Sequence, residues 1–323
     1  MFFPSSSNPE NYSTLKKNIK NYLLLVLRGM GMGAADVVPG VSGGTIAFIT
    51  GIYEELIYSI KSINLKAVRF FFTGRWRSFW KQINGNFLLA VFAGIFISVL
   101  SLAKILEYLL EHHPVLIWSF FFGLILASSY VVSRKIKEWK YSKVVALMGG
   151  IGIAFYITSV TPATTTDASW FVVLSGSLAS CAMILPGISG SFILLLLGKY
   201  EFALHAVNER LVFDLILLAV GAIAGLILFS NLLSWLLKRY YEVTIAILVG
   251  FMIGSLNKIW PWKETIQTIM VEGEAKPLVQ KNIMPGLGNP DDRVWLALLM
   301  ALAGIALIVI IELVLTRKPS GGK

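Results

Sequence analysis

Residues 38–44 read Val-Pro-Gly-Val-Ser-Gly-Gly, and residues 185–191 read Leu-Pro-Gly-Ile-Ser-Gly-Ser. Each stretch lies near the middle of a longer apolar region, residues 22–60 for the first and 170–207 for the second. Proline ends the helix that precedes it, and glycine permits a sharp turn. Both apolar regions are therefore predicted to be helices broken at the same kind of turn.

The composition is that of a membrane protein. The 323 residues are 56% hydrophobic and 14% charged, whereas soluble domains carry roughly 25% charged residues. The single cysteine cannot form an internal disulfide, and none of the three histidines has a partner at zinc spacing, so neither a metal nor another cofactor is expected. The net charge of +10 is spread over short loops between apolar runs, which argues against nucleic-acid binding.

Six further stretches are long and apolar enough to cross a membrane. A hydrocarbon core about 30 Å thick needs about 20 residues of helix. The predicted spans are Phe87–Leu106, Val115–Ser133, Val144–Val160, Leu211–Leu237, Val243–Leu256 and Val294–Leu315. Residues 264–293 are expected to be a polar outer loop.

The two broken regions are predicted to be re-entrant hairpins, which enter the membrane, turn near the midplane and leave on the same side. Irregular backbone at that depth is tolerated only where protein or a water-filled cavity satisfies it. With two such hairpins and a cytoplasmic N-terminus, 20 of the 28 basic residues fall on the cytoplasmic side, as the positive-inside rule favours. If the first region crossed fully, the basic loop 61–81 would move outside.

The two halves of the chain are repeats. Residues 39–54 and 186–201 are identical at 8 of 16 positions. Because each half has one hairpin and three spans, the second half is predicted to be inverted relative to the first, as in many secondary transporters. The predicted fold is therefore an all-α membrane protein of two inverted-topology repeats. The expected divisions are a polar cytoplasmic N-terminus 1–20, repeat 1 at 21–162, repeat 2 at 163–316 and a cytoplasmic tail 317–323.

The turns themselves suggest an anion site. Ser42 is a good N-cap for a helix expected to run unbroken to Glu54, with Tyr53 at the membrane interface. The backbone N–H groups of Gly43, Gly44 and Thr45 are expected to be open to a ligand, and a helix N-terminus favours anions. Ser189, Gly190 and Ser191 repeat this arrangement from the other side. The alternative is that these small residues only permit tight helix packing.

Two charges lie on the first arm of the first hairpin, at Arg28 and Asp36. A charge within the bilayer costs about 2.5–3.5 kcal/mol on insertion scales and usually has a function. Asp36 is expected to lie deep and to take up a proton or cation, or to serve the turn. Direct pairing with Arg28 is disfavoured, because eight residues separate them by roughly 12 Å along a helix. The alternative for Arg28 is an interfacial side chain that extends to water.

The run from Arg28 to Thr45 and the second turn at 185–191 resemble the signatures of the bacterial PopT-like membrane proteins, formerly a family of unknown function. The resemblance extends from about Lys20 to Leu315. It implies a translocase that returns undecaprenyl phosphate, the lipid carrier of cell-wall synthesis, to the cytoplasmic leaflet of the bacterial inner membrane. Its expected partner is a polyprenyl phosphate lipid, with a proton or sodium as candidate coupling ion. The candidate substrate-binding residues are Arg28, Asp36, Pro39, Gly40, Ser42, Gly43, Gly44, Thr45, Pro186, Gly187, Ser189, Gly190 and Ser191.

Two alternatives remain at this point. One is an ion-coupled transporter of another anion. The other is an enzyme, because Pro-Gly-x-Ser also resembles the signature of membrane undecaprenyl pyrophosphate phosphatases. In those enzymes an arginine follows the serine, whereas Gly43 and Gly190 stand there in this chain. Without that arginine, a pyrophosphate loses its bidentate partner.

The missing arginine gives a first prediction. The purified protein should release no inorganic phosphate from undecaprenyl pyrophosphate, measured by a colorimetric phosphate assay. Steady release that disappears on Ser42→Ala would instead assign the chain to the phosphatases.

Overall fold

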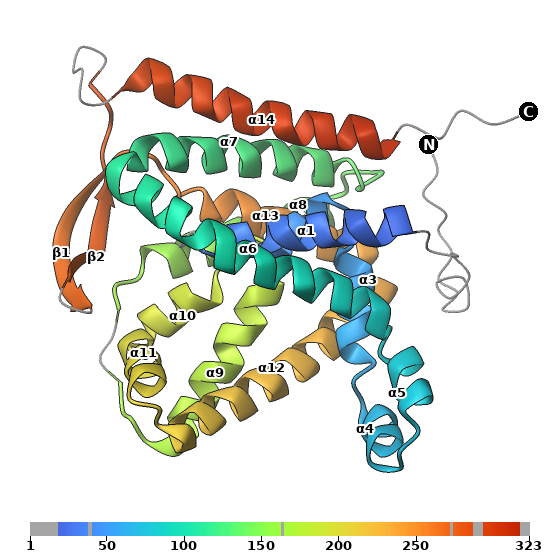
Figure 1. The fold of residues 1–323 in the computed structure, drawn as a ribbon. Coiled ribbons are helices and arrows are strands. Elements are labelled where there is room, and N and C mark those ends of the chain that lie inside the picture. The colour runs from blue at the N-terminus through green and yellow to red at the C-terminus, as the bar shows by residue number, and fades with distance from the viewer. Residues whose placement is uncertain (1–18, 38–40, 163–164, 272–273, 287–292, 317–323) are drawn as a thin grey trace, which may run out of the picture.

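The computed structural model describes residues 19–37, 41–162, 165–271, 274–286 and 293–316. The described chain is mostly helical (Figure 1). The first half contains α1 (Ile19–Val37), α2 (Gly43–Ile49), α3 (Tyr53–Lys61), α4 (Leu65–Phe72), α5 (Trp76–Gln82), α6 (Gly85–His112), α7 (Pro114–Ser133) and α8 (Tyr141–Ser159). The second contains α9 (Ser169–Ile184), α10 (Gly190–Leu196), α11 (Tyr200–Asn208), α12 (Val212–Arg239), α13 (Tyr241–Ser255), β1 (Lys263–Val271), β2 (Glu274–Asn282) and α14 (Val294–Thr316).

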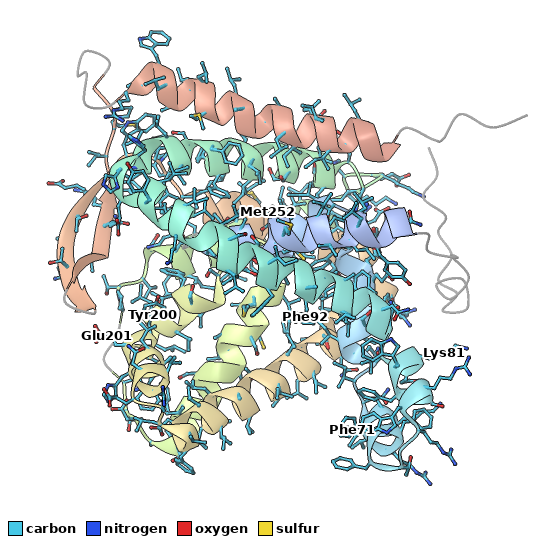
Figure 2. All side chains as sticks on the ribbon, in the orientation of Figure 1. Phe71, Lys81, Phe92, Tyr200, Glu201 and Met252 are labelled. Carbon is cyan, nitrogen blue, oxygen red and sulfur yellow. The ribbon has the colours of Figure 1, made fainter. Side chains whose placement is uncertain are left out.

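Each of the six predicted spans is a helix. Five of them, α6, α7, α8, α12 and α14, are long and apolar enough to cross a membrane. The sixth, α13, has only 15 residues, and most of its side chains are buried. Its Met252 lies in the middle of the helical bundle (Figure 2). The chain is therefore a multi-pass membrane protein whose α13 forms part of the core.

The second broken region turns at Gly187, as predicted, and in the first α1 ends at Val37 and α2 begins at Gly43. Each region also has a second break that was not predicted. The helix expected to run from Ser42 to Glu54 ends at Ile49 and restarts as α3, because Gly51 adopts a left-handed φ of +75°. Gly198, with φ +63°, separates α10 from α11 in the same way, and these two helices meet at 107°. Glycine at this position ends a helix without a Cβ penalty.

Tyr53, which was expected at the membrane interface, lies inside the protein. Its side chain is only 2% exposed, and its hydroxyl donates a hydrogen bond to the carbonyl oxygen of Ile184, 3.0 Å away. The early end of α2 turns the start of α3 inward, so that the tyrosine packs edge-on against Phe48.

The helices pack in four close pairs: α1 with α6, α9 with α12, α7 with α14 and α8 with α13. Glycines permit the closest approaches. A Cβ added to Gly94 of α6 would overlap the carbonyl oxygen of Val26 on α1, and one added to Gly225 of α12 would overlap Ser177 on α9. Small residues bring backbones together in this way in membranes, where packing rather than hydrophobic burial drives association.

The ends of the bundle differ in character. The start of α1, the end of α14 and the α4–α5 pair lie along one edge, and β1 and β2 lie at the opposite edge (Figure 1). The α4–α5 pair, which carries Phe71 and Lys81, projects beyond the helices that it joins (Figure 2). It occupies the basic segment that has almost no counterpart in the second half of the chain.

The segment that was predicted to be an outer loop corrects the prediction of an all-α fold. Strands β1 and β2 form an antiparallel pair, with Lys263 opposite Asn282 and Val271 opposite Glu274. Residues 263–271 mix polar with β-branched side chains, a composition that suits a solvated strand. The segment had been interpreted as loop because its polarity hides the apolar alternation on which strand prediction depends.

The glycine contacts predict unequal responses to substitution. Gly94→Val should force α1 and α6 apart and destabilise the protein by about 1–3 kcal/mol, because overpacked cores respond with backbone shifts. Gly149→Val on α8 is the control, since a Cβ there meets nothing within 4 Å. Thermal unfolding in detergent should show a lower Tm for the first variant only, and equal Tm values would contradict the proposed close packing.

Candidate functional site

The structure brings the two Pro-Gly bends into direct contact. The Ser42 hydroxyl lies 3.1 Å from the carbonyl oxygen of Leu185, to which it can donate. The backbone N–H of Gly187 donates to the Thr45 hydroxyl, 2.9 Å away. A Cβ on Gly44 would lie only 2.7 Å from the carbonyl oxygen of Ile184, so the small residue permits this approach. Each bend therefore supplies hydrogen-bond partners for the other.

At the first bend, the expectation that three backbone N–H groups are open was wrong for this conformation. The N–H of Gly43 donates to Oδ1 of Asp36 over 2.6 Å, and that of Gly44 donates to the Ser42 hydroxyl over 3.1 Å. The N–H of Thr45 donates to the Ser42 carbonyl oxygen. The carboxylate of Asp36 thus occupies the place that the dipole of α2 offers to an anion. Pro39 and Gly40 lie outside the described residues.

The second bend is arranged differently. Ser189 is the residue before α10, but its hydroxyl makes no capping bond and lies 2.8 Å from the hydroxyl of Ser191. In the described part of the chain, the backbone N–H groups of Gly190 and Ser191 have no acceptor. Gly187 makes the turn with φ +91°, and Pro186 is buried beside it. The start of α10 therefore keeps free donors.

These donors border a cavity of about 420 Å³ to which Asp36 also contributes. Most of the wall is apolar or small, and the polar side chains in it are Asp36 and three serines. The lining residues are Asp36, Gly176, Ala179, Ser180, Met183, Ser189, Gly190, Ser191, Leu194, Leu218, Ala219 and Ala222. This size and this mixture of apolar wall with few polar groups are typical of small-ligand sites. We call this space the central cavity.

Arg28 does not line the central cavity. It lies half-buried on α1, eight residues before Asp36, and the carboxylate that interacts with it electrostatically is Glu55 on α3. The disfavoured pairing of Arg28 with Asp36 is absent among the described contacts, where Asp36 is bonded to Gly43 instead. The two charges therefore occupy separate places along α1.

Sequence reasoning missed one ion pair between a buried lysine and an exposed aspartate. Lys199, only 1% exposed, pairs with Asp167 and lies near the rings of Phe171 and Phe202. The signal was a lysine inside an apolar run, at the position that Ile52 holds in the first half. A search of the described residues for three or more His, Cys, Asp or Glu side chains that could hold a metal found none.

Comparison with known proteins identifies the family to which the chain belongs. Residues 32–276 match the model of the VCA0040-like family, described as undecaprenyl phosphate translocase-like. A polyprenyl-phosphate transporter from Vibrio cholerae is 47% identical over 297 residues, which cover 90% of this chain and 96% of that protein. A polyprenyl-phosphate transporter from Staphylococcus aureus is 36% identical over 261 residues, covering 73% of this chain and 85% of the relative.

No solved structure matches the chain. The family match covers about three quarters of the sequence, including the last part of α1, the central cavity and both bends. Both relatives are named as transporters rather than as enzymes. The chain belongs to the undecaprenyl phosphate translocase-like family of membrane transporters.

Proposed function

We propose that this protein moves a polyprenyl phosphate, such as undecaprenyl phosphate, from the outer to the cytoplasmic leaflet of the bacterial inner membrane. The observation that carries the proposal is the 47% identity to a polyprenyl-phosphate transporter over nine tenths of this chain. The central cavity supports it, because free backbone donors and serine hydroxyls lie in a wall that, apart from Asp36, is made of apolar and small residues. A phosphate ester with a long apolar tail needs both kinds of surface.

The phosphate is proposed to bind at the start of α10. The N–H groups of Gly190 and Ser191 and the hydroxyls of Ser189 and Ser191 are donors that a phosphate accepts well. The leucines and small residues of α9, α10 and α12 would lie against the first part of the tail. Transport of a free hydrophilic anion, the remaining alternative, gives no reason for so apolar a wall.

Asp36 is proposed to give up its place at the start of α2 during the cycle. Its carboxylate and the phosphate carry like charges, and both favour the same donors, so they compete for them. When Asp36 swings away or takes up a proton, the N–H of Gly43 becomes available to the substrate. Binding of the phosphate at the first bend would then depend on the protonation or the position of the Asp36 side chain. A proton or sodium is the candidate coupling ion.

Arg28 is proposed to meet the substrate on the side where α1 begins. A half-buried guanidinium is costly in a membrane and binds phosphate in a bidentate manner. Glu55 interacts with it in the present conformation, and a phosphate leaving the central cavity toward that side would replace this partner.

The two halves are proposed to be inverted repeats that alternately open the site to either side. Several paired features support this. The breaks at Gly51 and Gly198 have the same backbone hydrogen bonds, including Ile52 to Ala47 and Lys199 to Leu194. Helix α1 packs on α6 as α9 packs on α12, and α7 packs on α14 as α13 packs on α8. Positive-inside counting places α4–α5 and both termini in the cytoplasm.

Substitution of Asp36 provides one test. Asp36→Asn retains an oxygen that can accept from Gly43, so the fold should survive, but transport should fall at least about tenfold because exchange with the phosphate loses its charge dependence. The measurement is leaflet accessibility of a labelled polyprenyl phosphate in proteoliposomes. Asp214→Asn, an acid at the start of α12, is the control. Undiminished transport by the Asp36 variant would remove this residue from the mechanism.

Arg28 gives a separate prediction in the same assay. Arg28→Ala should insert normally and transport poorly, whereas Arg28→Lys, which keeps the charge but loses the planar fork, should be intermediate. Wild-type rates for Arg28→Ala would exclude a role in transport.

The contact between the bends can be tested through Thr45. Thr45→Val leaves the buried N–H of Gly187 without its acceptor, which should cost about 1–3 kcal/mol of stability. Thr244→Val is the matched control, since the hydroxyl of Thr244 donates only to a carbonyl of its own helix turn. Thermal unfolding should separate the two variants, and a Tm for Thr45→Val equal to that of the control would argue that the bends are not interlocked.

A further inference from the structure

A second cavity, of about 310 Å³, lies where β2 covers the ends of α8 and α13. Three lysines line it, and none of its lining residues is acidic. They are Thr158, Ser159, Val160, Thr161, Pro162, Phe192, Asn257, Lys258, Lys263, Val279, Gln280, Lys281 and Asn282. We call this space the vestibule. It lies at the β1–β2 edge of the molecule, which the proposed orientation makes the outer side.

The walls of the vestibule are held by hydrogen bonds between elements. The Asn257 side-chain amide donates to the Ser159 hydroxyl over 3.1 Å and so ties the end of α13 to the end of α8. The Asn282 amide donates to the Asn257 carbonyl oxygen over 2.9 Å and fixes β2 above both helices. Hydrogen bonds therefore hold α8, α13 and β2 in place around the cavity.

The two lysines deepest in this region have no acidic partner among the described residues. Lys258 Nζ lies 4.6 Å from the centre of the Phe192 ring, and Lys263 Nζ lies 3.9 Å from that of Trp118. Burial, together with the positive charge of Lys258 beside it, lowers the pKa of Lys263 to about 7. Burial also lowers the pKa of Lys258. An anion bound between these two ammonium groups would stabilise their charged forms and so raise both pKa values.

The vestibule also adjoins the central cavity. Phe192 and Ser191 are consecutive residues in the first turn of α10, and Phe192 lines the vestibule while Ser191 lines the central cavity. An anion held by the lysines is thus separated from the free donors of α10 by a single helical turn with an aromatic side chain.

We propose that the vestibule is an outer capture site for the phosphate monoester of the lipid, in which Lys258 and Lys263 hold the headgroup before it passes Phe192 to the central cavity. The proposal rests on the proposed function. It assigns to the β1–β2 pair the role of a cover that carries Lys263 and Lys281 over the site.

Protection from acetylation tests this without any variant. Lysine reacts with a water-soluble N-hydroxysuccinimide ester as the neutral amine, so the rate at which Lys263 is acetylated in wild-type protein at pH 7.5 reports both its charge and its access through the vestibule. Farnesyl monophosphate should slow its acetylation about tenfold, the equivalent of one charge-assisted contact, while the uncharged alcohol farnesol should not. Peptide mass spectrometry measures the rate. Equal rates with and without farnesyl monophosphate would overturn the capture site, and equal protection by inorganic phosphate would assign it to free phosphate rather than lipid.

Transport kinetics provide a second test of the capture site. Lys258→Gln should raise the KM for polyprenyl phosphate about tenfold with kcat little changed, because a capture site acts before the rate-determining movement. Lys258→Arg should restore the KM, and Arg293→Gln, an exposed cation at the start of α14, is the control. A wild-type KM in Lys258→Gln would overturn the vestibule while leaving the proposed function intact. Absence of any transport by wild-type protein would instead refute the proposed function.

Discussion

The hydrogen bonds between the two bends are the interaction on which the rest of the molecule depends. A chain that breaks its helix inside a membrane exposes backbone groups that lipid cannot satisfy. Here the N–H of Gly187 finds the hydroxyl of Thr45, and the last carbonyls of α9 find the hydroxyls of Ser42 and Tyr53. In each of these described hydrogen bonds, the donor belongs to one broken region and the acceptor to the other. The two halves must consequently fold as one unit, although each resembles the other in sequence.

Much of this architecture was predictable because a segment that crosses lipid must be long, apolar and hydrogen-bonded within itself. Long uncharged runs predicted six helices, of which five are long and apolar enough to cross a membrane. Proline followed by glycine predicted the break between α9 and α10. The second breaks at Gly51 and Gly198 were not predicted, because a glycine in a helix interior becomes a helix end only when the following segment packs in a new direction. The strands β1 and β2 were missed because a solvated pair needs little apolar alternation.

Most of the residues proposed from sequence for an anion site lie near one another, but the hydrogen bonds that they make were not predicted. Sequence placed an anion-favouring helix start at each bend, and the structure does bring those segments together. What no sequence pattern revealed is that Asp36 fills one start while the other remains open, because this depends on how far α1 extends toward α2 in space. The two bends therefore differ in their hydrogen bonding, although their sequences are similar. The vestibule likewise joins α8, α13 and β2, which are distant in sequence.

The carboxylate held at the start of α2 has a consequence for selectivity. Without Asp36, the N–H of Gly43 at the start of α2 would be open to any small anion that reached it. With Asp36 as a tethered counter-ion, this helix end is already neutralised. Any anion that approaches this bend therefore meets a carboxylate that already accepts from the N–H of Gly43, and it must compete with a group that is part of the chain.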